Sequence, residues 1–312
     1  MVVTVFGSIN MDLVARTPRL PAPSETITSH EFFTAPGGKG ANQAVVTARL
    51  RVPTKMIGRV GDDTFGQELC QHLENTGVDV SAVFIDPEVT SGVAIIAIDD
   101  EAQNTIIIVP GANGRVGQAD VDRLKSNLTG VKVILLQLEV PLEATIAAAR
   151  LGRQMGVTVI LDPAPARDLP AELYTLVDII TPNEVEASQL VGFPVQTEAD
   201  AVRAADVFLS RGVKTAIIKM GALGVFYATQ RDDASKARNF LPAFNVNTID
   251  TVAAGDAFNG GLATALVEDR PLPVAVRWGA AVGVLSTTKL GAQPSMPNRV
   301  EFETFLQEQD PY

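Results

Sequence analysis

The alternation of apolar runs with amphipathic segments between residues 131 and 219 is the feature that most restricts the fold. Apolar runs at 131–136, 157–161, 177–180 and 215–219 predict strands, and the segments at 142–155, 183–190 and 198–210 predict helices. Strands that alternate with helices form a parallel sheet with helices on both faces. We therefore expect a three-layer α/β/α fold around a mostly parallel sheet.

The rest of the chain extends this pattern at both ends. Further strands are expected at 2–6, 55–60 and 83–85, and helices at 36–50, 65–75, 256–268, 273–288 and 301–307. Antiparallel edge strands are expected at 224–228 and 236–241, with a solvated polar loop at 231–235 between them. The pattern predicts one α/β domain over residues 1–312.

Two segments, 13–36 and 92–109, do not follow the alternation. Prolines interrupt the first, and the second has the pattern of a hairpin around Asp99-Asp100-Glu101. We expect them to form a small second sheet that acts as a lid on the site, with Gly37-Gly38 as its hinge.

Composition excludes several classes of function. The 312 residues are 46% hydrophobic, and 25 Lys and Arg against 36 Asp and Glu give a net charge of −11, which argues against nucleic acid or an anionic membrane as partner. One cysteine and two histidines exclude an intrachain disulfide and a Cys/His metal cluster. The apolar runs are far shorter than the ~20 residues of a membrane span. The first residues lack a basic segment and are expected to form a strand, so a cytoplasmic location is expected.

The stretch 250–260 predicts an anion site. An extended run, 244–249, leads through Asp250-Thr251 to the small-residue loop Ala253-Ala254-Gly255, and a helical pattern begins at Asp256. A small-residue loop before a helix leaves backbone N–H groups unpaired at the positive end of the helix dipole, which suits phosphate. Asp256 in the first turn either accepts a proton from an attacking hydroxyl or only caps the helix, and this stretch alone favours neither.

Polar residues follow the expected strands where ligands bind in open α/β sheets. Asn10 and Asp12 are two residues apart, so an extended chain points both side chains to one face. Other such positions are Glu139, Asn183, Gly221 and Asp256. Together they predict one site at one edge of the sheet.

Two further motifs are ambiguous on their own. Gly37-Gly38-Lys39-Gly40 is not a P-loop, because glycine follows the lysine, but it allows close approach of a ligand; alternatively, Lys39 is simply solvated. Lys39 and Asn42 lie one helical turn apart. The spacing in Thr181-Pro182-Asn183-Glu184 predicts a capping box with Thr181 as N-cap and Glu184 at the third position.

Taken together, these segments resemble the ribokinase-like sugar kinases of the PfkB family. Gly38-Lys39-Gly40-Ala41-Asn42-Gln43 is similar to the N-terminal signature of the family, and Asp250-Thr251-Val252-Ala253-Ala254-Gly255-Asp256 is similar to its C-terminal signature. The similarity spans essentially the whole chain. It implies ATP-dependent transfer of a phosphoryl group to a sugar, most closely to the 5-hydroxyl of D-ribose, and a homodimer formed through the lid sheet.

The resemblance also implies roles for individual residues. Asp256 would be the catalytic base, with the backbone N–H groups of Ala254 and Gly255 on the transferring phosphate. The sugar hydroxyls would be held by Asn10, Asp12, Gly38, Lys39, Asn42, Glu139 and Asp256. The nucleotide would contact Asn183, Lys219, Met220, Gly221, Ala222, Leu223, Gly224 and Gly255.

Two metal ions are implied by the same resemblance. Mg²⁺ would accompany ATP, with Glu186 in its shell. A monovalent cation, K⁺, would act as activator, held by the Asp250 carboxylate, by carbonyl oxygens of Val252, Ser286, Lys289 and Gly291, and by Ser295.

Two positions depart from the family pattern. Ala253 replaces the first glycine of Gly-Ala-Gly-Asp, and Ala280 stands where some members place a histidine near the adenine. The alternatives are a kinase for 2-deoxyribose or another sugar such as a ketohexose, and, in a different class, a non-catalytic sugar-binding protein.

Overall fold

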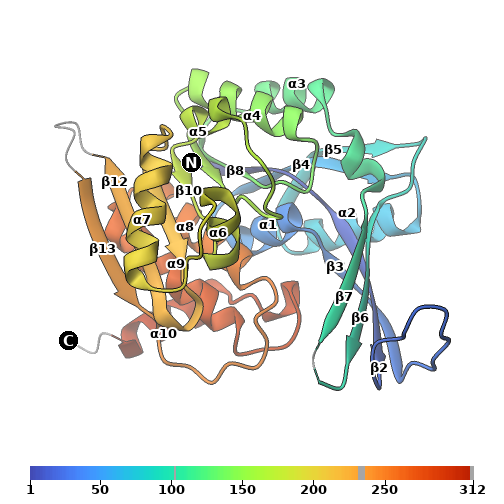
Figure 1. The fold of residues 1–312 in the computed structure, drawn as a ribbon. Coiled ribbons are helices and arrows are strands. Elements are labelled where there is room, and N and C mark those ends of the chain that lie inside the picture. The colour runs from blue at the N-terminus through green and yellow to red at the C-terminus, as the bar shows by residue number, and fades with distance from the viewer. Residues whose placement is uncertain (102, 231–235, 310–312) are drawn as a thin grey trace.

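The centre of the molecule is a β-sheet with the strand order β13-β12-β11-β10-β9-β8-β1-β4-β5 (Figure 1). The computed structural model describes residues 1–101, 103–230 and 236–309, so the loop expected at 231–235 lies outside the described residues. Neighbouring strands are parallel from β11 to β5, and β12 is antiparallel to both of its neighbours. The strands are β1 Val2–Phe6, β4 Thr54–Gly61, β5 Val78–Asp86, β8 Val131–Leu136, β9 Thr158–Leu161, β10 Ile179–Ile180, β11 Thr215–Lys219, β12 Gly224–Gln230 and β13 Lys236–Pro242.

Helices cover both faces of this sheet, which confirms the expected three layers. Successive residues of β8 show the reason: Val133 and Leu135 pack into one core cluster, while Ile134 and Leu136 pack into the other. The first layer holds α1 Lys39–Arg49, α2 Thr64–Asn75, α8 Ala254–Val267, α9 Leu272–Ser286 and α10 Arg299–Gln309. The second holds α3 Gln118–Ser126, α4 Leu142–Gln154, α5 Ala171–Leu176, α6 Glu184–Val191 and α7 Glu198–Ser210.

The short helices α3 and α5 were not predicted from the sequence. Each has only two buried apolar side chains, Val121 with Leu124 and Leu173 with Tyr174, which is too few to establish a period of 3.6 residues. Among the described helices, none has the length and apolar character needed to cross a membrane.

A second, smaller sheet projects from the main body in Figure 1. Its strands, in the order β3-β2-β6-β7, are β2 Asn10–Thr17, β3 Glu31–Gly37, β6 Gly92–Asp99 and β7 Asn104–Val109. β6 and β7 form the expected hairpin, and β6 pairs in parallel with β2. This small sheet confirms that 13–36 and 92–109 contribute strands outside the main sheet; its role as a lid stays a prediction.

The extended run expected at 244–249 is not a strand, which corrects the sequence-based prediction. After β13 ends at Pro242 the chain is irregular up to α8. The backbone N–H groups of Ile249 and Asp250 both donate to the carbonyl oxygen of Thr287, at 2.7 and 3.1 Å. The end of the run is thus held by a carbonyl at the C-terminus of α9 instead of a neighbouring strand.

The capping box before α6 is shifted by two residues from the predicted one. Asn183 is the N-cap, and its Oδ1 accepts a hydrogen bond from the Glu186 N–H at 2.8 Å. Glu186 Oε2 accepts the Asn183 N–H at 2.8 Å in return. Thr181 is fully buried and its hydroxyl donates to Asn259 Oδ1 at 2.8 Å, so it is not available as a cap.

Candidate active site

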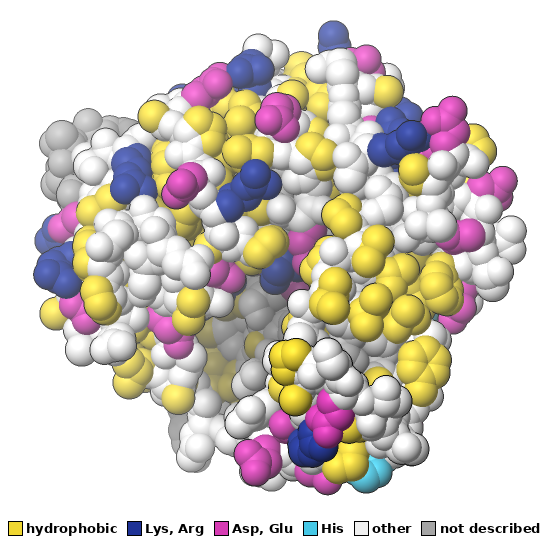
Figure 2. Space-filling model, turned by 45° about the vertical axis from the view of Figure 1, so that its right-hand side comes forward, with side chains coloured by type: hydrophobic (Ala, Val, Ile, Leu, Met, Phe, Trp, Pro, Cys, Tyr) yellow, Lys and Arg dark blue, Asp and Glu magenta, His cyan; other side chains and the backbone are white. Residues whose placement is uncertain are grey.

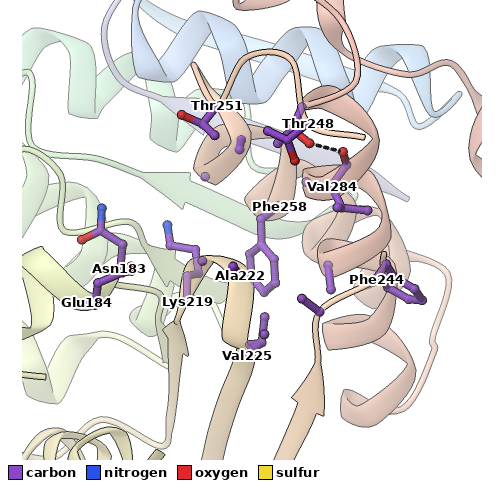
Figure 3. Close-up of a pocket in the computed structure, with 18 of the residues that line it drawn as sticks. Asn183, Glu184, Lys219, Ala222, Val225, Phe244, Thr248, Thr251, Phe258 and Val284 are labelled. Atoms are coloured by element: carbon purple, nitrogen blue, oxygen red, sulfur yellow. Dashed lines mark hydrogen bonds between the residues drawn. The ribbon is translucent and has the colours of Figure 1, made fainter. Parts of the chain in front are cut away.

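A cavity of about 960 Å³ lies at the carboxyl ends of β9, β10 and β11, beside the first turn of α8. In Figure 3, Asn183 and Lys219 lie on one side, Val284 and Phe244 lie on the other, and Phe258 stands between them. Part of the wall is polar, with Lys39, Asp162, Asn183, Glu186, Lys219, Thr251 and Asp256. Another part is apolar, with Val225, Phe244, Val246, Phe258, Ala280 and Val284. Such a cavity suits a ligand with a flat apolar group at one end and charges at the other.

The N-terminus of α8 forms one wall of this cavity. Its N-cap residue, Ala253, has φ 58° and ψ 12°, and no side chain caps the helix. Ala254 and Gly255 follow and line the cavity. The Ala254 N–H is not free in this structure, because it donates to the carbonyl oxygen of Thr251 at 3.2 Å. A Cβ at Gly255 would lie 3.1 Å from Lys219 Nζ, so glycine leaves room for the lysine beside the helix end. Backbone N–H groups, a helix dipole and a lysine therefore converge where an anion would bind.

Asp256, in the first turn of α8, is a buried carboxylate with a donor on each oxygen. Asn42 Nδ2 donates to Oδ2 at 3.0 Å, and Gln43 Nε2 donates to Oδ1 at 3.1 Å. Lys39 Nζ lies 4.0 Å from Oδ1. Burial raises the pKa of Asp256, the positive charge of Lys39 lowers it, and the net shift is upward.

Lys39 is surrounded by carboxylates. Burial alone would lower its pKa, but these neighbours raise that pKa above the usual value for lysine. They are Asp256, Asp162, Glu139 and Glu186. The lysine is therefore a fixed positive charge at neutral pH, at the boundary between α1 and the cavity.

The residues predicted for the sugar come together where the small sheet meets α1. Asn10 pairs with Gly37 across β2 and β3, and a Cβ at Gly38 would lie 2.8 Å from the Asn10 nitrogen. Gly38 has φ 88°, a value that glycine adopts without strain. Close approach of the chain at these glycines brings the start of β2 next to the start of α1.

Two further carboxylates belong to this cluster. Glu139 Oε2 accepts hydrogen bonds from the Ser8 hydroxyl at 2.5 Å and from the Lys39 N–H at 2.9 Å. Burial, with the negative charges of Glu139 and Asp256, raises the pKa of Asp12 to about 7. Asp12 therefore changes its charge near neutral pH.

On the nucleotide side, most of the predicted residues line the cavity. They are Asn183, Lys219, Gly221, Ala222, Gly224 and Gly255. Met220 is instead buried, and Leu223 is 52% exposed outside the cavity wall. Asn183 Nδ2 also donates to Glu186 Oε1 at 3.0 Å, and burial followed by the charge of Asp162 raises the pKa of Glu186.

Asp250 joins the two segments predicted to hold a monovalent cation. Its Oδ1 accepts from the Val252 N–H at 3.0 Å, and its Oδ2 accepts from the Gly291 N–H at 2.8 Å. Ser286 and Ser295 are fully buried, and each hydroxyl donates to a carbonyl oxygen at 2.7 Å, of Gly283 and Ala292 respectively. The side chain of Lys289 turns away to pair with Glu301 at 2.7 Å.

Three buried polar residues in this region were not singled out from the sequence. Asp162 accepts hydrogen bonds from Lys219 Nζ and Gln43 Nε2, both at 3.1 Å, and it follows β9 just as Asn183 follows β10. The strand-end rule could therefore have identified Asp162. Gln43 lies next to Asn42 in the same motif, which was a usable signal. Asn113 donates to Asn10 Oδ1 at 2.7 Å from a 3₁₀ turn, and its segment carries no local sign of this contact.

The chain also matches known proteins over nearly its whole length. The model of the pfkB family carbohydrate kinases matches residues 2–299. A ribokinase from Haemophilus influenzae is 40% identical over 304 residues, covering 97% of this chain and 98% of that relative. A deoxyribokinase from Salmonella typhi is 36% identical over 307 residues, covering 98% and 99%. The structure of Arabidopsis thaliana ribokinase complexed with ribose and ATP has a TM-score of 0.88 at 33% identity and covers 98% of each chain.

The fold and the cavity beside α8 are thus those of an ATP-dependent sugar kinase. The chain belongs to the pfkB family of carbohydrate kinases, which confirms the resemblance seen in its two signatures. Both a ribokinase and a deoxyribokinase are among its relatives, so membership of the family does not by itself determine the sugar.

Proposed function

We propose that this chain transfers the γ-phosphoryl group of ATP to the 5-hydroxyl of D-ribose, with Asp256 as the general base. The observation that carries the proposal is the position of Asp256. It is a buried carboxylate bound by Asn42 and Gln43 of α1, and it also lines the cavity that holds the N-terminus of α8. A hydroxyl bound on the α1 side can give its proton to Asp256 while it attacks a phosphoryl group at the helix end.

The charges around Asp256 suit a base that works near neutral pH. Burial makes the carboxylate a stronger base, and Lys39 keeps it from being protonated too readily. The backbone N–H group of Gly255 would stabilise negative charge that develops on the transferring phosphoryl group. The N–H of Ala254 would join it on leaving the Thr251 carbonyl oxygen, to which it donates at 3.2 Å. The protein thus supplies position and electrostatic stabilisation, which are what phosphoryl transfer needs most.

The sugar would lie between the start of β2 and the start of α1. Asn10 Oδ1 is occupied by Asn113, which leaves the Asn10 amide N–H groups to donate to a sugar oxygen. Carboxylates accept from sugar hydroxyls, and the remaining groups donate. The residues are Asn10, Asp12, Gly38, Lys39, Asn42, Glu139 and Asp256. Ribose as the preferred sugar is supported by the similarity to the ribokinases named above.

The nucleotide would occupy the cavity, with its phosphates toward α8. Asn183, Lys219 and the turn that includes Gly221, Ala222 and Gly224 would contact it from one side. Ala280 lines the cavity one helical turn before Val284 on α9, where it leaves more space than a larger side chain would. Phe258 and Val284 supply apolar surface for the adenine.

The residues present fit a magnesium ion that accompanies ATP. Glu186 and Asp162 both line the cavity, and burial, followed by repulsion from the charge of Asp162, raises the pKa of Glu186. A cation beside them would relieve this repulsion, and Mg²⁺ prefers one or two carboxylates together with phosphate oxygens. We propose that Glu186, with Asp162, holds the ion directly or through water. When bound, the ion would neutralise charge on the phosphates.

A monovalent cation at Asp250 is also part of the proposal. The donors named for it are hard oxygen atoms, as K⁺ requires. They are the Asp250 carboxylate, the carbonyl oxygens of Val252, Ser286, Lys289 and Gly291, and an oxygen of Ser295. Asp250 already ties the loop before α8 to the turn at 291–295, so a cation between these segments would stiffen the same connection.

We further propose that a second copy of this chain covers the outer face of the small sheet, and that the enzyme works in the cytoplasm. All six residues of β7 are exposed. Figure 2 shows apolar side chains gathered on the projecting part of the molecule (Figure 2). On the face of the small sheet opposite Asp12, the exposed apolar side chains include Phe32, Ile95 and Ile107. Exposed apolar surface of this extent is typical of a protein interface.

Ile107→Glu should shift the mass measured by light scattering to that of a monomer, whereas Val300→Glu on α10, where the valine is equally exposed at 57%, should not. A monomeric unmodified protein would exclude the dimer.

The test of the catalytic proposal is Asp256→Asn. This change keeps the shape of the side chain and removes the base, so turnover should fall by about 10²–10⁴-fold. Binding of sugar and ATP, measured by calorimetry, should persist. Turnover close to that of the unmodified enzyme would show that Asp256 is only a structural partner of Asn42 and Gln43. The capping role that the sequence left open is already excluded, because no side chain caps α8.

The sugar is decided by ADP release with ribose, 2-deoxyribose, fructose and adenosine. We expect the highest kcat/KM with ribose. A higher kcat/KM with 2-deoxyribose would instead indicate a deoxyribokinase, like the relative from Salmonella typhi. If the protein binds a sugar but releases ADP with none of the four, it is instead a non-catalytic sugar-binding protein.

A further inference from the structure

Gln43 is a buried side chain that contacts two carboxylates with a single amide group. Its Nε2 donates to Asp256 Oδ1 and to Asp162 Oδ2, both at 3.1 Å. The residue is fully buried, and both carboxylates are about 2% exposed. A side-chain amide has two hydrogens on its nitrogen, so one is available for each carboxylate.

The two carboxylates determine the orientation of this amide. Gln137 Nε2 donates to Gln43 Oε1 at 2.6 Å, so the carbonyl end is occupied. If the amide were turned over, its oxygen would face two carboxylate oxygens, and that contact is repulsive. Gly7 makes room for Gln137, since a Cβ at Gly7 would lie 2.0 Å from Gln137 Oε1. The three residues thus form a directed network that ends on Asp256.

We propose that Gln43, oriented between its partners, is a positioning residue that holds the carboxylate of Asp256 and thereby sets its basicity. The hydrogen bond from Gln43 favours the charged form of Asp256, whereas the charge of Asp162 disfavours it. The same amide connects the carboxylate on the sugar side with the carboxylate beside Lys219 on the nucleotide side. This inference rests on the proposed role of Asp256 as general base.

The test is the pH profile of kcat at saturating sugar and ATP, where sugar binding through Asp12 does not contribute, for two variants, Gln43→Met and Gln43→Glu. Methionine keeps the length and removes the donor, so the acid limb of the profile should move up by about one pH unit or more. Glutamate is closer to glutamine in shape but places a third carboxylate in the cluster, so it should move the limb further. The expected shift of the acid limb is thus larger for Gln43→Glu than for Gln43→Met. Packing alone would produce the opposite order, because glutamate is the closer match to glutamine in shape.

Controls separate this inference from the catalytic proposal. Gln118→Glu places a carboxylate beside Asp122, to which Gln118 donates at 2.9 Å on the exposed side of α3, and it should leave the profile unchanged. Asp256→Asn is measured in parallel: activity retained there refutes the general base, whereas loss of activity there with an unchanged acid limb in both Gln43 variants refutes the role of Gln43 alone.

If changes at Gln43 prevent folding, a variant of its hydrogen-bond partner Gln137 tests the same inference. Gln137→Met removes the donor to Gln43 Oε1 without touching Asp256. It should move the acid limb in the same direction by a smaller amount, with the melting temperature reporting the folded fraction. An acid limb identical to that of the unmodified enzyme would overturn the inference.

Discussion

Gln293 donates a hydrogen bond from Nε2 to Asn42 Oδ1 at 3.0 Å, across 251 positions in sequence. Because the Asn42 oxygen is occupied in this way, its amide nitrogen faces Asp256 and donates to it at 3.0 Å. Gln293 stands in the same turn whose Gly291 N–H binds Asp250. The turn at 291–295 therefore contacts both the loop before α8 and the side chain that orients the proposed base.

The first prediction concerns the monovalent cation. Turnover should rise when K⁺ replaces a bulky organic cation at constant ionic strength, because an ion at Asp250 would fix the loop that aims the α8 N–H groups. Asp250→Ala should blunt this rise. The measurement is kcat with K⁺ and with the organic cation, for the unmodified protein and for Asp250→Ala. A rate that does not depend on the cation would show that protein contacts alone hold this loop.

The second prediction concerns Lys39, whose Nζ lies 4.0 Å from Asp256 Oδ1. Lys39→Met removes a positive charge that lowers the pKa of Asp256, so kcat/KM at pH 7 should fall by about 10–10³-fold and recover in part at higher pH. Lys125→Met on the exposed side of α3 is the control and should have no effect. A higher KM for the sugar with an unchanged pH profile would mean that Lys39 contacts the sugar without tuning the base.

The third prediction is a pH dependence of sugar binding through Asp12. Its pKa is raised to about 7, and sugar hydroxyls donate to the ionised form, so the Kd for ribose should decrease as pH rises from 6 to 8 and then level off. Asp12→Asn should weaken binding and remove most of this dependence. Calorimetric titration with ribose at several pH values is the measurement, and a Kd that is flat in the unmodified protein would contradict the role of Asp12.

Asp12 also predicts a pH dependence of stability. Its folded-state pKa of about 7 lies above the ordinary value of 3.8, so the folded state holds the proton after the unfolded chain has released it. Its contribution to the free energy of unfolding is therefore complete below about pH 4 and is lost as pH rises to about 7. Asp12→Asn should make denaturant unfolding less dependent on pH in this window; equal dependence in both proteins would contradict the expectation.

The last prediction is that the small sheet closes on the sugar, with Gly37-Gly38 as hinge. Closure would exclude water and limit wasteful hydrolysis of ATP. Hydrogen exchange should slow in 13–36 and 92–109 when ribose is added, while α4, on the far side of the main sheet, should exchange as before. Unchanged exchange in both segments would show that the small sheet does not act as a lid.

The sequence by itself determined most of the scaffold. The predicted bounds of β8, α7 and β11 agree with the structure to the residue. Each of these elements carries its own signal, because a buried parallel strand is a continuous apolar run and a helix has a period and caps. The two signatures likewise identified the family, and they place Lys39, Asn42 and Asp256 together, as the structure does.

The tertiary structure decided which of several locally equivalent possibilities is realised. Thr181 and Asn183 are both acceptable caps with glutamate three residues on, and only the buried contact of Thr181 with Asn259 leaves the cap to Asn183. The run at 244–249 has the pattern of a strand, but its last N–H groups bind the end of α9.

The same limit applies to the network around the proposed base. Gln43, Gln137 and Asp162 lie on three separate segments, and their hydrogen bonds span 94 to 213 positions in sequence. Local patterns report how one segment folds, whereas such contacts exist only after helices and sheet have packed. Which buried donor faces which carboxylate is therefore determined by the packed fold, through the cost of leaving any of these groups without a partner.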